Sequence, residues 1–173
     1  MLTLCFTPFP VIETDRLILR CIDKTDAYDI LALRSDDRIN EHVERKKMLL
    51  IEEAEYFIYK IRSGIEKSEL IYWVITDKQT GKMLGTTGIW NVEPEECAAE
   101  LGYELLYNEH GKGYMTEAVK SVVEYAFQTM KLNTIKAVVR DTNLASLKII
   151  DKMKFTLDKK EGNELFFVLR SAQ

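Results

Sequence analysis

The chain has 173 residues, of which 46% are hydrophobic and 30% are charged, and this composition excludes an intrinsically disordered chain. Its formal net charge of -4 provides no overall attraction to nucleic acid or to an anionic membrane, so we expect neither as a partner. The three cysteines, Cys5, Cys21 and Cys97, have no C-x-x-C spacing, which argues against a metal site or a disulfide framework and fits a reducing compartment.

No segment approaches the ~20 apolar residues that a membrane-spanning helix needs. The apolar start, residues 1–10, is short, lacks a basic leader and is interrupted by Pro8 and Pro10, so we do not expect a signal peptide. No repeat, low-complexity tract or linker divides the chain. We therefore expect a cytoplasmic protein with one continuous domain over residues 1–173.

The first third of the chain predicts one strand followed by two helices. Residues 16–20 alternate roughly between polar and apolar side chains, as a strand does. Asp23 or Thr25 can cap a helix that runs to about Ser35. Apolar residues then recur at helical spacing over residues 51–65, which predicts a second helix.

The middle of the chain changes to the pattern of strands. Residues 70–76 and 83–90 are rich in strand-forming residues and flank a polar turn that contains Gly81, so they predict a hairpin. An acidic connection over residues 93–96 leads to a further strand at about 97–106.

The strongest helix signal follows this strand. Its apolar residues recur every three or four positions and form a broad stripe that must be buried against a sheet: Met115, Ala118, Val119, Val122, Val123, Ala126, Phe127 and Met130. Residues 134–140 predict a strand, 145–153 a short helix and 163–170 a last strand. The order β-α-α-β-β-β-α-β-α-β predicts a mixed α/β layer fold with a central antiparallel hairpin.

A strand, a short loop and this long helix form the segment of chemical interest. Gly111 and Gly113 let the loop turn tightly and approach a ligand closely. The first N–H groups of the helix have no internal partner and carry the positive end of its dipole, so they suit phosphate oxygens, and Lys112 adds a positive charge. A Gly-x-Gly before a helix also occurs as a plain turn, so the loop alone leaves both interpretations open.

The wider segment resembles a known cofactor motif. It lacks the P-loop pattern and the third glycine of a dinucleotide fingerprint. It is similar to the acetyl-CoA-binding motif of the GNAT N-acetyltransferase superfamily, Gln/Arg-x-x-Gly-x-Gly/Ala. The RimJ/RimL-type branch, of ribosomal-protein N-acetyltransferases, has Gly-Tyr-x-Leu and then Trp-Gly-x-Gly-Tyr-x-Thr-Glu-Ala. Residues 102–105 and 111–118 match these runs almost in full.

Two more segments extend the resemblance over nearly the whole chain. Residues 13–20 are similar to the family's opening strand, and residues 143–146 with 152–155 are similar to its second cofactor motif. The resemblance implies the GNAT acyl-CoA N-acyltransferase fold, an α/β fold with a central mixed, largely antiparallel sheet flanked by helices. It also implies acetyl-CoA as the cofactor. The cofactor-binding residues that it implies are Tyr103, Leu105, His110, Gly111, Lys112, Gly113, Tyr114, Met115, Thr116, Asn143 and Ser146.

The implied activity is transfer of acetyl to a primary amine that attacks the thioester directly. We expect the acceptor to be a protein N-terminal α-amino group of the ribosomal-alanine type. A small-molecule amine (polyamine, amino acid or antibiotic) is the alternative, and a non-catalytic acyl-CoA-binding module is a third possibility. Monomer and homodimer both stay open.

Four positions depart from the family pattern. His110 stands where the branch often has Trp or Gln, and Asn108 where the wider motif has Gln or Arg. Lys154 replaces the usual glycine, so we expect the last helix to end without a left-handed cap. Ile150 occupies the position of a Tyr that serves many members as the general acid, so that role does not transfer.

Glu100 and Ser146 are the catalytic candidates. Glu100 is the first choice for the base that takes the amine's proton, and Glu104 is the second. On a regular strand the two carboxylates share one face, whereas the resemblance implies a bulge between them. Glu100 could equally be a solvated strand carboxylate. Ser146 is either the donor to the departing thiolate or a serine that satisfies backbone donors at a helix start.

Overall fold

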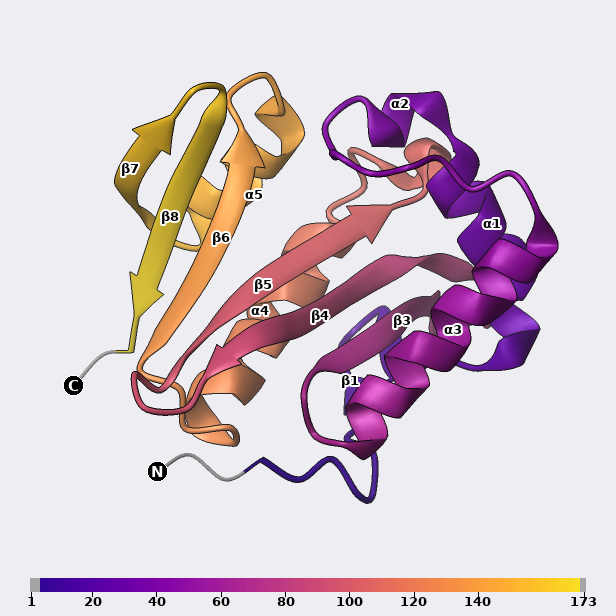
Figure 1. Cartoon of the computed structure of the whole chain (residues 1–173), viewed down its shortest axis with the longest axis horizontal. Coiled ribbons are helices and arrows are strands. Elements are labelled where there is room, and N and C mark those ends of the chain that lie inside the picture. The colour runs from indigo at the N-terminus through magenta and orange to yellow at the C-terminus, as the bar shows by residue number, and fades with distance from the viewer. Residues whose placement is uncertain (1–3, 172–173) are drawn as a thin grey trace.

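The computed structural model of the chain describes residues 4–171, and its centre is an eight-stranded sheet with the order β1-β2-β3-β4-β5-β6-β8-β7 (Figure 1). The sheet is antiparallel except where β5 meets β6. Its strands are β1 (Ile12–Glu13), β2 (Leu17–Cys21), β3 (Ile71–Asp77), β4 (Met83–Glu93), β5 (Ala98–Leu105), β6 (Thr134–Arg140), β7 (Thr156–Glu161) and β8 (Glu164–Arg170).

Helices cover both faces of this sheet, with α3 in front of it and α4 behind it in Figure 1. The helices are α1 (Ala27–Ser35), α2 (Asp37–Asn40), α3 (Ile51–Glu66), α4 (Tyr114–Gln128) and α5 (Leu144–Lys152), with short 3-10 turns η1 (Lys24–Asp26) and η2 (Tyr107–Glu109). The predicted mixed α/β fold, with a largely antiparallel sheet flanked by helices, is confirmed.

The core lies between the sheet and its two helical layers. Of the apolar stripe on α4, Met115, Ala118, Val119, Val122 and Ala126 are buried, as predicted. The first six residues of β3 are buried in succession, because helices cover this strand on both faces. The two helical layers thus pack against the central strands, including β5, which leads into the glycine loop and α4.

The pairing of β5 with β6 stops early. The two parallel strands pair only from Ala98↔Thr134 to Glu100↔Lys136, and beyond that point they separate (Figure 1). The partner that β6 keeps along its whole length is β8. The edge of β5 from Leu101 to Leu105 that faces β6 therefore has no neighbouring strand.

The bulge that the family resemblance implied between Glu100 and Glu104 is absent from the pairing of β4 with β5. Their register is continuous from Gly85↔Leu105 to Trp90↔Glu100, and the irregularity lies further on, between Trp90 and Glu93. The expectation of a bulge is therefore wrong. Both carboxylates project from the same face of a regular strand.

Three elements had no sequence signal that we used: β1, α2 and β7. All six residues of β7 are exposed, so this charged edge strand lacks the apolar alternation by which strands are recognised. It is defined by its pairing with β8 across the turn at Gly162.

Within residues 4–171 no helix has the length and apolar character to cross a membrane. The same residues contain no cluster of three or more His, Cys, Asp or Glu side chains arranged to hold a metal ion. The first three residues of the apolar start lie outside the described residues.

The expectation that α5 ends without a left-handed cap is wrong. Lys154 itself adopts the left-handed conformation, with φ 64. Its N–H donates to the carbonyl of Asp151 at 2.9 Å, and the N–H of Phe155 donates to Ile150 at 3.1 Å. These hydrogen bonds satisfy the last carbonyls of the helix and bury Phe155, which outweighs the steric cost of a Cβ in this conformation.

Glycine at position 154 removes this steric cost, although its greater freedom in the unfolded chain offsets part of the gain. We expect Lys154→Gly to raise the free energy of unfolding by about 0.5–1 kcal/mol, or roughly 1–4 °C in Tm. Urea denaturation measures it. The matched control is Lys148→Gly in the exposed middle of α5, which should lower the free energy of unfolding by about 1 kcal/mol. Equal losses at both positions would contradict the prediction.

Candidate functional site

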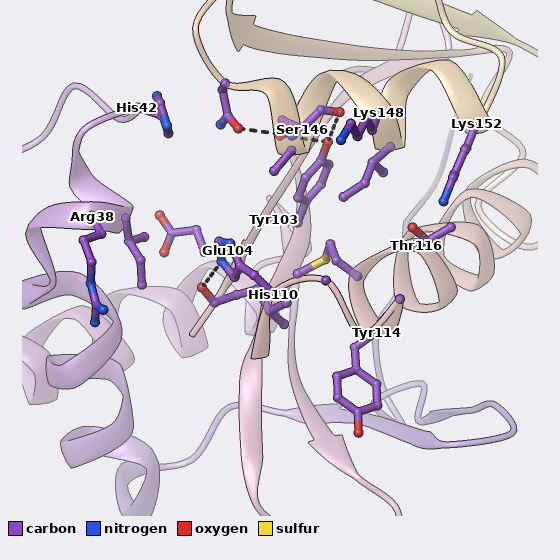
Figure 2. Close-up of a pocket in the computed structure, with 18 of the residues that line it drawn as sticks. Arg38, His42, Tyr103, Glu104, His110, Tyr114, Thr116, Ser146, Lys148 and Lys152 are labelled. Atoms are coloured by element: carbon purple, nitrogen blue, oxygen red, sulfur yellow. Dashed lines mark hydrogen bonds between the residues drawn. The ribbon is translucent and has the colours of Figure 1, made fainter. Parts of the chain in front are cut away.

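Two adjoining cavities lie where β5 and β6 separate. The first, of about 420 Å³, is lined by Gly111, Gly113, the start of α4 and one side of α5, and we call it the loop cavity (Figure 2). The second, of about 470 Å³, lies between β5 and β6, and we call it the inter-strand cavity. Their shared wall consists of His42, Val43, Tyr103, Glu104, Asn143 and Ser146.

The glycine loop takes a conformation that only glycine adopts readily. Gly111 has φ 78 and Gly113 has φ 81, and Gly113 is the N-cap of α4. The first helical hydrogen bond links the N–H of Glu117 to the carbonyl of Gly113 at 3.2 Å. The N–H groups of residues 114–116 therefore have no acceptor within the helix. N–H groups of this kind are the groups that bind anions at helix starts, and the loop cavity lies beside them.

Glu117, in the first turn of α4, fastens this loop to the N-terminal segment. Its carboxylate accepts from the Thr14 hydroxyl at 2.6 Å, the Arg16 N–H at 2.9 Å and Arg16 Nε at 2.7 Å. Arg16 also donates to the carbonyl of Lys112 at 2.9 Å. Burial opposes the charged carboxylate, but these hydrogen bonds outweigh it and hold the pKa of Glu117 below its usual value.

The charge of Lys112 fastens the other side of the loop. Its ammonium lies 2.7 Å from the carboxylate of Glu109, and that of Lys82 lies 2.8 Å from it. Glu109 is only 6% exposed, and the hydrogen bonds from Lys112 and then Lys82 hold its pKa below the ordinary value. Lys112 is therefore committed to Glu109 and does not line the loop cavity.

Two lysines that our sequence reasoning missed face the loop cavity instead. Lys148 and Lys152 come from α5, and Figure 2 shows Lys152 reaching towards Thr116 at the start of α4. Within the described part of the chain neither ammonium makes an ion pair or a hydrogen bond. The available signal was their spacing of four residues within the helix that contains Ser146, because this spacing puts both lysines on one helix face.

Apart from Lys112, the cofactor-binding residues that the family resemblance implied come together. Those that line the loop cavity are Tyr103, Leu105, His110, Gly111, Gly113, Tyr114, Met115, Thr116, Asn143 and Ser146. His110 lies with Nε2 3.0 Å from the carbonyl oxygen of Leu105. Its ring therefore packs back onto the end of β5.

Tyr103 and Ser146 meet in the shared wall, as Figure 2 shows. The Ser146 hydroxyl donates to the phenol oxygen of Tyr103 at 3.1 Å, while the Ser146 N–H donates to the side chain of Asn143 at 3.1 Å. Asn143 thus caps α5 and frees the serine hydroxyl. Burial raises the pKa of Tyr103 to about 12, against the opposing effect of the Ser146 hydrogen bond. The phenol therefore stays protonated at neutral pH and can donate a hydrogen bond.

The two candidate carboxylates have different surroundings. Glu104 lies in the shared wall, and the guanidinium groups of Arg45 and Arg34 engage its two oxygens. Glu100 lines the inter-strand cavity and accepts from the side-chain amide of Asn91 at 2.9 Å. No cation among residues 4–171 pairs with Glu100. The two carboxylates therefore differ: arginines hold Glu104, and a neutral amide holds Glu100.

Comparisons with known proteins agree with this geometry. The acetyltransferase (GNAT) domain family matches residues 16–156. The uncharacterized N-acetyltransferase YoaA of Bacillus subtilis (strain 168) is 35% identical over 154 residues, which cover 89% of this chain and 85% of that protein.

Solved structures share the fold at low sequence identity. The ribosomal-protein-S5-alanine acetyltransferase of Vibrio fischeri superposes with a TM-score of 0.83 at 20% identity, covering 93% of this chain and 96% of that one. RimL, a ribosomal α-N-protein acetyltransferase in complex with coenzyme A, superposes with a TM-score of 0.82 at 18% identity, covering 93% and 98%. With its family match over residues 16–156, its RimJ/RimL-like fold and its N-acetyltransferase relatives, the chain belongs to the GNAT acetyltransferases and is an acyltransferase.

Proposed function

We propose that the protein is an acetyl-CoA-dependent N-acetyltransferase that transfers acetyl to a primary amine by direct attack on the thioester. The observation that carries the proposal is the meeting of the two cavities at a shared wall that contains Tyr103 and Ser146. The loop cavity offers anion-binding groups, and the inter-strand cavity offers an unpaired carboxylate, Glu100. A cofactor in one and an amine in the other would meet at this wall.

The residues of the loop cavity fit acetyl-CoA. The free N–H groups of residues 114–116 and the unpaired ammonium groups of Lys148 and Lys152 suit phosphate oxygens. The open edge of β5 over residues 101–105 suits an extended, amide-containing arm, because such an arm can pair as a strand does. When bound, acetyl-CoA supplies an acetyl group activated as a thioester.

The chain's own residues would handle the protons. A primary amine is protonated at neutral pH and must lose a proton before it can attack. Glu100 accepts this proton, because Asn91 holds one of its oxygens and no cation within residues 4–171 pairs with the carboxylate. The Ser146 hydroxyl donates to the phenol oxygen of Tyr103, and the phenol O–H would be the donor that stabilises negative charge at the shared wall.

The acceptor that we propose is a protein N-terminal α-amino group of the ribosomal-alanine type. The structural likeness to the S5-alanine acetyltransferase and to RimL supports this choice. A small-molecule amine is the alternative. We expect N-terminal peptides to be acetylated with a higher kcat/KM than polyamines or antibiotics, measured as release of free CoA. Turnover of small amines alone would exclude the protein acceptor.

Acetyl-CoA should bind and stabilise the protein. At about 100 times its Kd it should add ~2.7 kcal/mol to the free energy of unfolding, seen as a thermal shift. Glu117→Gln should weaken binding about tenfold in calorimetry, because the loop loses the carboxylate that fastens it, a change equivalent to ~1.4 kcal/mol. Glu124→Gln, an exposed carboxylate further along α4, is the matched control. Absence of any shift in the wild type would overturn the proposed function.

Removal of the proposed base should lower the rate of turnover and leave the affinity for the cofactor unchanged. We expect Glu100→Gln to lower kcat by about 10²–10⁴-fold with acetyl-CoA affinity unchanged. With a peptide acceptor the deficit should shrink above about pH 8, where an α-amino group is already neutral. Glu95→Gln, in the exposed connection before β5, is the control. Unchanged turnover in Glu100→Gln would place the base elsewhere.

A further inference from the structure

We infer that the acceptor carries a carboxylate a few bonds from its amine, and that Arg34 in the inter-strand cavity binds this carboxylate. The inference rests on the proposed function, since it concerns the amine that this cavity would hold. The acceptor would thus be an amine that also carries a negative charge.

Arg34 lies in α1 and lines the inter-strand cavity with a side chain that is 18% exposed. Its buried Nε has no hydrogen-bond partner, and within residues 4–171 no other nitrogen of the guanidinium donates a hydrogen bond. The approach of Nη1 to Glu104 is 3.7 Å, which is too long for one. Its other contact is the ring of Phe57, 4.3 Å away, and a cation–π contact uses the face of the guanidinium and none of its N–H groups.

The charges around Arg34 are unbalanced. Arg45 and Arg34 both face the one carboxylate of Glu104. Arg45 donates to Asn40 through Nε at 2.7 Å, but its buried Nη2 has no partner. Among residues 4–171, two guanidinium groups thus share the carboxylate of Glu104, whose buried Oε2 also has no hydrogen-bond partner. Burial of charge with unsatisfied donors costs more than burial of a complete pair, so the cluster favours an added anion.

The shape of the free donors favours a carboxylate. A guanidinium presents its N–H groups as a planar fork, which matches the two oxygens of a carboxylate. Burial lowers the pKa of Arg34 and Glu104 raises it, yet the group remains charged, as arginine does in proteins. The cavity therefore offers a fixed cation with its N–H groups uncommitted.

The position of Arg34 puts such a carboxylate close to the proposed point of transfer. The residue it approaches, Glu104, belongs to the shared wall together with Tyr103 and Ser146. An acid bound by Arg34 would therefore leave its own amine near this wall.

Two sources can provide this chemistry: the α-carboxylate of a free amino acid, and an acidic side chain at the start of a protein chain. Pairs of acceptors that differ only in charge test both. One arm compares free amino acids with their amides, and the other compares peptides with Asp or Glu in the first two positions with their Asn or Gln counterparts. In one of the two arms, we expect kcat/KM for the acidic acceptor to be at least about tenfold higher than for its neutral counterpart.

Arg34→Gln should remove this preference. We expect it to lower kcat/KM for the acidic acceptor about 100-fold, mainly through KM, and to leave the neutral counterpart within about twofold. Arg34→Lys keeps the positive charge but loses the planar fork of N–H groups. Its kcat/KM for the acidic acceptor should therefore lie between the values of the wild type and of Arg34→Gln. Arg62→Gln is the control, because Arg62 is half exposed, bonds to Asp23 and lies outside both cavities. Urea unfolding of each variant verifies the fold.

The outcomes separate the inference from the proposed function. A preference for the acid in either arm, lost in Arg34→Gln, supports the inference and identifies the source. Equal use of neutral and acidic acceptors, or an equal loss for both in Arg34→Gln, overturns it while acetyl transfer stands. Binding of acetyl-CoA without transfer to any amine overturns the proposed function, and the inference with it.

Discussion

The structure depends on the early end of one strand pairing. After Glu100↔Lys136 the parallel strands β5 and β6 separate, and β6 keeps its place in the sheet because β8 pairs with it along its full length. The free edge of β5, the inter-strand cavity and the shared wall all follow from this separation. If β5 and β6 were paired along their full length, the sheet would have no room for a ligand between them.

Two carboxylates, Glu109 and Glu117, divide the positive charges near the glycine loop into two groups. Glu109 and Glu117 bind Lys112 and Arg16, and these pairs fix the shape of the glycine loop. Lys148 and Lys152, on α5, have no ionic partner among the described residues and face the loop cavity. The cations closest to the motif in sequence are therefore structural, and the cations available to an anionic ligand come from a later helix.

Local patterns predicted most of the fold. The stripe from Met115 to Met130 predicted α4, and the strand predicted at residues 134–140 has the bounds of β6. The site was predictable only where its residues are close in sequence. The contact of Tyr103 with Ser146 spans 43 positions, and the approach of Arg34 to Glu104 joins α1 to β5; neither has a periodic signal. At Lys154 a local rule failed, because backbone hydrogen bonds overrode the preference for glycine.

The shared wall has a consequence for the order of events. Each side chain in it, Tyr103 above all, presents one surface to the loop cavity and another to the inter-strand cavity. A ligand that fixes the position of Tyr103 on one side also fixes the surface that the other ligand meets. Thermodynamic linkage makes this effect reciprocal, so each ligand changes the affinity for the other by the same factor. We therefore expect ligands in the two cavities to bind cooperatively.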